Sequence, residues 1–282
     1  MITVGIVYHH HPGTPMFESG DSVTVVTHVN ADANGETPWR GFGENHNALM
    51  EAATGSDWYV ALNPDVAVTQ EDIVRLVEFA QSGGYAIAGP MIRTPGGLVD
   101  RPAYDFPTPG AWFRQAIAGT RRAERRAELQ PRDDHAPGEP AWISGACMAI
   151  DLRGAARRFD ERYFMYFEDI ELCHRAFTNR EGIGFCTDLV VDHETGWSLS
   201  DPLRWRKGVE FARGALLFAE KLDTSPALMR AAGIARFGSR IPFRASVESE
   251  LVGTRCVARG FLNPGAPGLI ELARSWSPAP QL

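Results

Sequence analysis

Three groups of polar side chains lie at or just beyond apolar segments of this 282-residue chain. The groups are Asn63 with Asp65, Glu168 with Asp169, and Asp192 with His193. In open α/β sheets, ligands bind in the crevice outside the carboxyl ends of the strands. A carboxylate placed there is costly unless it meets a cation or a substrate. Oxygen ligands together with an imidazole suit Mg²⁺ or Mn²⁺, and both ions also bind diphosphates.

Each group also has an ordinary structural interpretation. Asn-Pro-Asp is a common turn sequence, so Asp65 could simply be a turn residue. Glu168 and Asp169 could favour a helix N-terminus through the helix dipole. A single histidine such as His193 is often a satisfied surface or core residue. The recurrence of these groups at successive strand ends is what favours one shared site.

The segments that carry these groups predict an α/β protein. Strand composition occurs at 3–8, 23–29, 58–62, 85–92, 142–150 and 183–191. Helical composition occurs at 44–54, at 70–82 after the N-cap Thr69, and at 169–177. The resulting order, which begins β-β-α-β-α-β, predicts a mainly parallel sheet flanked by helices.

After about residue 200 the pattern becomes helical, at 205–222 and 225–237. We therefore predict a catalytic domain over 1–200 and a C-terminal helical extension over 201–282. The extension is expected to lie on the acceptor side of the site or to mediate homodimerisation. The stretch 114–140 is rich in charged residues and proline, and it is expected to begin as a helix and end as a loop.

The composition limits the binding partners and the cellular compartment that we expect for this protein. The net charge of −7 argues against broad binding of nucleic acid. The four cysteines form no C-x-x-C pair and stand in apolar contexts, so we expect buried, reduced thiols in the cytoplasm. No apolar run approaches the ~20 residues that a spanning helix needs, and the N-terminus is too polar for a signal peptide. A soluble protein is therefore expected, and it could still touch a membrane surface.

Two clusters of cationic side chains have competing interpretations. The arginines at 121, 122, 125 and 126 are most simply a solvated helix face, although they could contact an anionic lipid or a lipid-linked acceptor. The histidines at 9, 10 and 11 lack the spacing of metal ligands on a helix, and we expect them in a loop near the donor site.

Several of these segments together resemble one known family. Ser144-Gly145-Ala146-Cys147-Met148 is followed by FDERYFMYFEDIELC at 159–173, and then by His193 and Ser198. Gly41-Phe42-Gly43, Asn47 and Leu62-Asn63-Pro64-Asp65 precede them in the same order and spacing. This set is similar to the family 2 glycosyltransferases of the rhamnosyltransferase type. The resemblance covers about residues 3–198, and the 159–173 stretch is its most specific part.

The resemblance implies a GT-A (Rossmann-like) fold, a divalent cation (Mg²⁺ or Mn²⁺) and an inverting transfer from a nucleotide diphosphate sugar. Asp65 matches the metal-binding aspartate, with Asn63 in the first position of a degenerate D-x-D motif. Asp169 matches the catalytic base, and His193 matches a histidine that helps to bind the metal or the diphosphate. Glu168 could raise the pKa of Asp169 by like-charge repulsion, or could only orient it.

The same resemblance assigns the two halves of the substrate site. Donor-binding positions would include Tyr8, His9, Gly41, Phe42 and Asn47. On the acceptor side, Gly145 and Ala146 would line the site, and we expect Trp142 and Tyr166 there as well. The aromatic run Tyr163, Phe164, Tyr166 and Phe167 is mainly core and pocket wall, although one of its rings could stack on a sugar.

Two features depart from the family pattern. Only His9–Asp21 separates the first two strands, where the family has a long helix. The usual aspartate that reads the donor base is also absent after the second strand, so either the donor is unusual or Asn30 or Asp32 replaces that aspartate.

The sequence thus predicts transfer of a sugar from dTDP-rhamnose, or from a related dTDP- or UDP-sugar, to a hydroxyl group. The acceptor would be a glycan, a glycolipid or a glycosylated small molecule. Two alternatives are a hydrolase that cleaves the nucleotide sugar with water, and a non-catalytic nucleotide-sugar-binding protein with a degenerate donor site.

Overall fold

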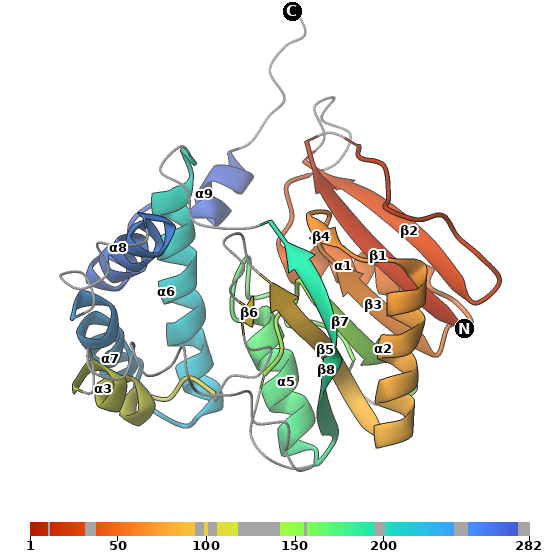
Figure 1. The fold of residues 1–282 in the computed structure, drawn as a ribbon. Helices are drawn as coiled ribbons and strands as arrows, with labels where there is room; N and C mark the ends of the chain where they lie inside the picture. Colours follow the sequence, from red (N-terminus) through yellow and green to blue (C-terminus); the bar gives the residue numbers. More distant parts are fainter. Residues whose placement is uncertain are drawn as a thin grey trace, which may run out of the picture.

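The computed structural model describes residues 1–10, 12–31, 38–93, 99–100, 106–117, 142–154, 157–194, 201–239 and 248–275. Within them a single sheet has the strand order β2-β1-β3-β7-β5-β8-β4, with β6 paired to β5 (Figure 1). The strands are β1 (Ile2–His9), β2 (Val23–Asn30), β3 (Trp58–Leu62), β4 (Val66–Ala67), β5 (Tyr85–Arg93), β6 (Val99–Asp100), β7 (Cys147–Asp151) and β8 (Gly182–His193). The helices are α1 (Phe42–Ala52), α2 (Gln70–Gly83), α3 (Pro109–Ile117), α5 (Glu168–Thr178), α6 (Arg204–Lys221), α7 (Pro226–Gly238), α8 (Glu248–Leu262) and α9 (Leu269–Arg274).

Strand directions make the sheet mixed but mainly parallel. β1 pairs in parallel with β2 and β3, and β5 pairs in parallel with β8. β7 runs antiparallel between β3 and β5, while the two-residue strands β4 and β6 run antiparallel to β8 and β5. The structure therefore confirms the predicted α/β class, and it adds one reversed strand in the middle of the sheet.

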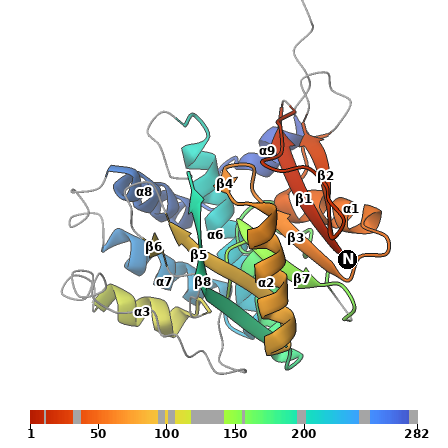
Figure 2. The ribbon, with the colours of Figure 1, turned by 45° about the vertical axis from the view of Figure 1, so that its right-hand side comes forward.

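Helices cover both faces of the sheet, and β3 shows the consequence. All five of its residues are buried, which is expected of a strand covered on both sides. Because side chains alternate along a strand, Trp58, Val60 and Leu62 join the core beneath α2, whereas Tyr59 and Ala61 face the core formed with α1 and α5. Figure 2 shows α2 lying across one face of the sheet.

The predicted start and end of α2 are confirmed in detail. The Thr69 hydroxyl accepts a hydrogen bond from the backbone N–H of Asp72, and the Asp72 carboxylate accepts one from the backbone N–H of Thr69. These reciprocal bonds form a capping box. The helix ends at Gly84, whose φ of 66° is the left-handed conformation that glycine adopts at low cost.

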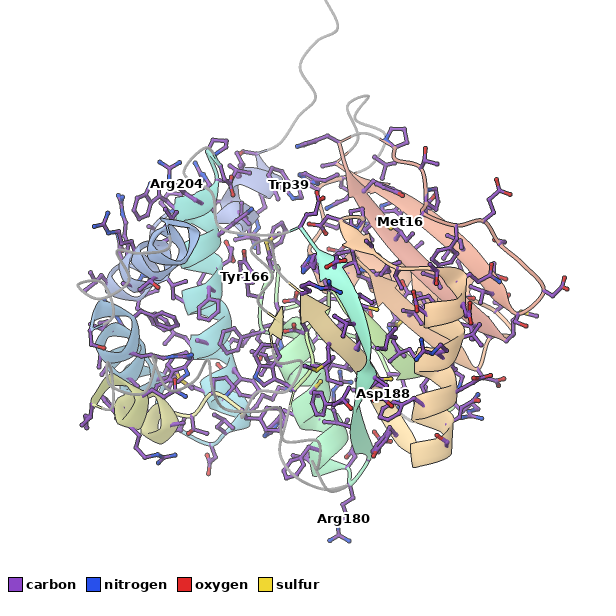
Figure 3. The ribbon with its side chains drawn as sticks, in the orientation of Figure 1. Met16, Trp39, Tyr166, Arg180, Asp188 and Arg204 are labelled. Carbon is purple, nitrogen blue, oxygen red and sulfur yellow. The ribbon has the colours of Figure 1, made fainter. Side chains whose placement is uncertain are left out.

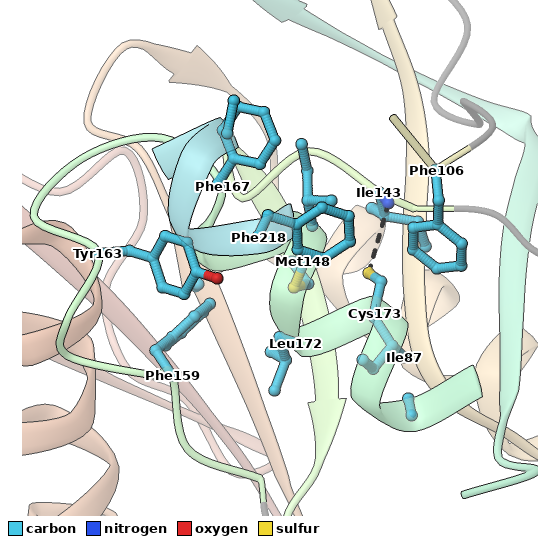
Figure 4. Close-up of a cluster of buried hydrophobic side chains, with 14 of the residues drawn as sticks. Ile87, Phe106, Ile143, Met148, Phe159, Tyr163, Phe167, Leu172, Cys173 and Phe218 are labelled. Carbon is cyan, nitrogen blue, oxygen red and sulfur yellow. Dashed lines mark hydrogen bonds between the residues drawn. The ribbon is translucent and has the colours of Figure 1, made fainter. Parts of the chain in front are cut away.

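The C-terminal helices share a core with the sheet. Phe218 of α6 packs against Phe167, with ring centroids 5.8 Å apart, and against His174 of α5 at 5.3 Å. Figure 4 shows this cluster, in which the Ile143 N–H donates to the Cys173 sulfur at 3.5 Å. Trp112 of α3 also packs against Phe261 of α8 at 5.6 Å, so a helix from the first half of the chain joins the C-terminal group. The predicted division at residue 200 stays a prediction.

Several sequence predictions need correction. The strand predicted over 142–150 is formed only as β7, because Gly145 and Ala146 make a turn before it. β4, β6, α8 and α9 were not predicted. No helix occurs among the described residues between β1 and β2, as the sequence indicated. The four cysteines are buried and free of disulfides. Among the described helices, none has the length and apolarity required to cross a bilayer.

Candidate active site

Asn63, Asp65 and His193 meet at one edge of the sheet. The Asn-Pro-Asp turn leads directly into β4, and β4 pairs with the last residues of β8, so that Val66 faces His193. The His193 Nε2 atom lies 3.2 Å from Asp65 Oδ1 and 3.4 Å from Asn63 Nδ2. The backbone N–H of Glu194 also donates to the Asp65 carbonyl at 3.1 Å. Residues 130 positions apart in the chain are thus brought into one polar cluster.

The reversed strand β7 brings a second segment to the same edge. Because β7 is antiparallel to β3, its first residue, Cys147, pairs with the last residue of β3, Leu62. The preceding residues therefore lie beside the Asn-Pro-Asp turn, where the Asn63 N–H donates to the Ala146 carbonyl at 2.8 Å. Gly145, one residue earlier, donates its N–H to Asp169 Oδ2 at 3.0 Å.

Asp169 is therefore connected to the Asp65–His193 pair through the backbone of Gly145 and Ala146 and through Asn63. It lies in the first turn of α5, and its second carboxylate oxygen accepts the Ile170 N–H at 2.8 Å. Burial raises the pKa of Asp169 to about 6, against the opposing effect of the N–H donors of Gly145 and Ile170. A carboxylate with such a pKa can accept a proton near neutral pH.

Glu168 has a different environment from its neighbour. It is buried, and its Oε2 atom has no hydrogen-bond partner among the described residues. Burial and the charge of Asp169 raise the pKa of Glu168 well above its usual range. The like-charge effect that the sequence suggested on Asp169 therefore acts on Glu168, and burial is what raises the pKa of Asp169.

A tightly held turn positions the start of α5. Tyr166 and Phe167 both have left-handed backbone conformations, with φ of 70° and 74°, which non-glycine residues seldom adopt. Helix α6 packs directly on this turn, because a Cβ atom at Gly214 would lie 2.8 Å from the Tyr166 carbonyl oxygen. Phe211 of α6 also contacts the rings of both turn residues. The C-terminal helices thus fix the turn that carries Glu168 and Asp169.

The predicted donor residues Tyr8 and His9 lie at the carboxyl end of β1. The centroid of the His9 ring lies 3.9 Å from that of His10 and 4.9 Å from that of Trp39. Partial burial, together with the neighbouring His10, lowers the pKa of His9, so the imidazole is neutral at pH 7. Trp39 was not among the predicted residues, since a tryptophan in a polar turn-like segment carries no positional signal. Together these rings form an aromatic surface that could stack on a base or a sugar.

Two predicted donor residues have structural tasks. Asn30 is buried, and its side chain accepts from the Arg40 N–H at 2.8 Å and donates to the Arg40 carbonyl at 3.0 Å. Asn47 is buried in α1 and makes the same kind of paired contact with the backbone of Phe159. Both amides hold loops through these bonds, and the donor contacts predicted for them stay predictions. Asp32, the other candidate for reading the donor base, lies outside the described residues.

The remaining predicted residues are divided between the site and its support. Phe42 is half-buried, lies beside Gly145 and donates its N–H to the Phe164 carbonyl at 2.9 Å, while Gly41 packs against the backbone of Phe164. Tyr166 packs on α6, and Trp142 is half-buried against the core. Ser198 and the arginines at 121–126 lie outside the described residues.

The possible metal-ligand atoms at this edge of the sheet suit a hard divalent cation. Within the described ranges, no three His, Cys, Asp or Glu side chains are grouped closely enough to enclose a metal. Asp65, His193 and the amide of Asn63 offer only part of a coordination shell. Mg²⁺ is commonly bound by one or two carboxylates together with substrate phosphates rather than by a full protein cage. The residues therefore fit a cation that arrives with, or is completed by, a diphosphate.

Comparisons with known proteins place the chain near sugar transferases. No family model matches. The chain is 34% identical over 125 residues to the N-acetylglucosaminyl-diphospho-decaprenol L-rhamnosyltransferase of Mycobacterium tuberculosis. This match covers 42% of the chain and 41% of that protein. The chain is 35% identical over 134 residues to a low-salt glycan biosynthesis hexosyltransferase of Haloferax volcanii, covering 47% and 40%. The rhamnosyltransferase WbbL of Escherichia coli is 26% identical over 145 residues, covering 48% and 53%.

These relatives confirm the predicted resemblance to rhamnosyltransferase-type proteins, and the matches span about two fifths to one half of the relatives' own lengths. Among solved structures, a mannosyltransferase of Pyrobaculum calidifontis in complex with GDP-Man and Mn²⁺ has a TM-score of 0.49 at 12% identity, covering 98% of this chain and 88% of that one. TarS of S. aureus in complex with UDP-GlcNAc has a TM-score of 0.49 at 11% identity, covering 97% and 87%.

Proposed function

We propose that this chain is an inverting GT-A glycosyltransferase that moves a sugar from a nucleotide diphosphate donor to an acceptor hydroxyl. The observation that carries the proposal is the continuous path from His193 and Asp65 through Asn63 and Ala146 to Gly145 and Asp169. The Asp65–His193 pair, proposed to hold the cation and diphosphate, therefore shares one edge of the sheet with Asp169, the proposed base. The names of the sequence relatives support sugar transfer.

In this proposal Asp169 accepts the proton of the attacking hydroxyl as the new glycosidic bond forms. Its Oδ2 atom is held by Gly145 and its Oδ1 atom by Ile170, so the carboxylate has a fixed orientation. Asp65 and His193 would hold the divalent cation, with Asn63 beside them. When bound, Mg²⁺ or Mn²⁺ would neutralise charge on the departing diphosphate. Glu168 lies in the first turn of α5, where burial and the charge of Asp169 raise its pKa and so favour its neutral form.

We propose dTDP-rhamnose or a related dTDP- or UDP-sugar as the donor. Two sequence relatives are named rhamnosyltransferases. The acceptor of the mycobacterial relative, by its name, is a sugar carried on diphospho-decaprenol. We therefore propose a lipid-linked or otherwise glycosylated acceptor here, and a cytoplasmic location in line with the free, buried cysteines.

The C-terminal helices are proposed to form the acceptor side. A cavity of about 310 Å³ lies between the 162–166 loop and helices α6 and α9. Its lining combines the rings of Tyr163, Phe164 and Tyr166 with Arg274 and with Arg213, which pairs with Glu210 and Glu271 of the same lining. Aromatic rings suit sugar faces, and guanidinium groups suit phosphates.

A screen of nucleotide sugars tests the proposed donor. Ligands that bind only the folded state raise its apparent stability. We expect a dTDP- or UDP-sugar to raise the melting temperature more with Mn²⁺ than without it, and expect the same compound to be consumed only when an acceptor is added. Full consumption with water alone would indicate the hydrolase, and binding without any turnover would indicate the non-catalytic protein.

Gly214 offers a test of the proposed support for Asp169. In Gly214→Ala the new methyl group must displace the Tyr166 carbonyl, so we expect turnover per folded molecule to fall by ~10- to 100-fold, as misplacement of a catalytic group by an ångström can cost. We also expect the pH dependence of turnover to shift, because Asp169 moves with the turn.

Gly208 on the same helix provides the matched control. A Cβ atom there would meet the Cys256 carbonyl at 2.2 Å, on the side of α6 that faces α8. Gly208→Ala should therefore lower the free energy of unfolding without changing turnover per folded molecule or its pH dependence. If both variants lose activity only in proportion to their unfolded fraction, Gly214 has no positioning role.

A further inference from the structure

The C-terminal helices carry a charge opposite to that of the rest of the chain. Residues 201–282 contain twelve Lys and Arg against seven Asp and Glu, whereas residues 1–200 contain sixteen against twenty-eight. An acidic protein with a basic helical extension presents a polarised surface. An anionic partner would be attracted to the extension and repelled by the remainder.

One exposed area of the extension combines this charge with large apolar side chains. It consists of Trp205, Arg255, Arg259 and Leu262, with Arg204 at its border, and is called the Trp205 surface below. The guanidinium carbons of Arg259 and Arg204 lie 4.8 and 5.7 Å from the centre of the Trp205 ring. Trp205 is 36% exposed and Leu262 is 61% exposed.

The arrangement along α8 makes this surface continuous. Arg255, Arg259 and Leu262 are all exposed, and their spacing of four and three residues places them on one face of the helix. Among the side chains that the structure describes, no carboxylate forms an ion pair with Arg255 or Arg259. These guanidinium groups are therefore available to an external anion.

We propose that the Trp205 surface docks on a membrane that contains anionic phospholipid. Tryptophan suits the boundary between water and hydrocarbon, leucine can enter the acyl layer, and arginine binds lipid phosphates. Arg204, at the border of the surface, lies at the upper end of the molecule in Figure 3, and the arrow of β8, which ends at the candidate active site, points toward the same end. If the proposed function holds, a lipid-linked acceptor would be met at that membrane.

Binding of the full chain to vesicles tests this proposal. We expect flotation with vesicles of phosphatidylglycerol and phosphatidylcholine in equal parts, little flotation with pure phosphatidylcholine, and weaker binding at high salt. Each arginine near an anionic surface contributes about fivefold in affinity. The double variant Arg255→Gln/Arg259→Gln should therefore bind on the order of twentyfold more weakly.

Arg180→Gln is the matched control, because Arg180 is exposed at the opposite end of the molecule, as Figure 3 shows. It should bind vesicles as the wild type does. Wild-type binding that is absent, that does not depend on anionic lipid, or that the double variant retains would overturn the proposal. Vesicle binding without any sugar transfer would leave the docking surface in place and reject the proposed function instead.

Discussion

Asp169→Asn should abolish sugar transfer while leaving donor affinity within a few fold of wild type. The asparagine side chain can still accept an N–H bond from Gly145 or Ile170, so the turn that holds it should persist. It cannot accept the proton of the attacking hydroxyl. Loss of a general base costs about 10²- to 10⁴-fold in rate, which initial rates at saturating donor would measure.

The pH dependence of the wild type gives an independent readout of the same residue. Because burial raises the pKa of Asp169 to about 6, the carboxylate is deprotonated above that pH and protonated below it. Turnover should therefore be full above pH 7 and should fall as the pH is lowered through about 6.

Asp192→Asn is a suitable control, since Asp192 is exposed beside His193 and pairs with Arg93. This variant should transfer sugar at the wild-type rate. Near wild-type transfer by Asp169→Asn would show that the base has been assigned wrongly.

Asp65→Ala should remove most of the effect of Mn²⁺ on donor binding. Asp65 supplies the carboxylate of the pair with His193, at 3.2 Å, and a carboxylate contributes most to the binding of a hard cation. We expect calorimetry to show donor affinity in Mn²⁺ falling by roughly tenfold or more, as losses of groups at metal sites commonly do. When a chelator removes the metal, Asp65→Ala and the wild type should bind the donor with similar affinity.

The neighbouring residues refine this expectation. His193→Ala should give a smaller loss of the same kind, because Asp65 remains. Asp192→Asn should keep the full effect of Mn²⁺, since its carboxylate is engaged by Arg93. An Asp65→Ala variant whose donor affinity still tightens with Mn²⁺ as in the wild type would exclude Asp65 as a metal ligand.

The general position of the site could be predicted because it follows from strand ends. Apolar runs that stop at Asn63 and His193 are visible in the sequence, and side chains after parallel strands gather at one edge. The prediction that Glu168 and Asp169 also follow a strand was wrong, because they begin α5. The link between these groups was not visible. It depends on the reversed direction of β7, which places Gly145 and Ala146 beside Asn63. The direction of a strand cannot be predicted from its composition.

The backbone contacts of two predicted donor residues were not visible in the sequence either. Asn30 and Asn47 occupy positions that look available in the sequence, yet their amides pair with the backbone of Arg40 and Phe159. Such long-range use of a side chain cannot be inferred from its neighbours in the chain. Helix α8 was missed for another reason. Its glycines and β-branched residues lower its intrinsic helix propensity, and packing against α6 and α7 compensates for this in the folded protein.

The central claim is that one edge of the sheet holds both a cation-bound diphosphate and a separate base. It is tested most directly by measuring donor affinity with Mn²⁺ and transfer rate on the same preparations of wild type, Asp65→Ala and Asp169→Asn. The account predicts two separable losses, in which Asp65→Ala loses Mn²⁺-dependent affinity and Asp169→Asn loses only the rate. Wild-type behaviour in both variants, or an equal loss of affinity and rate in each, would contradict it.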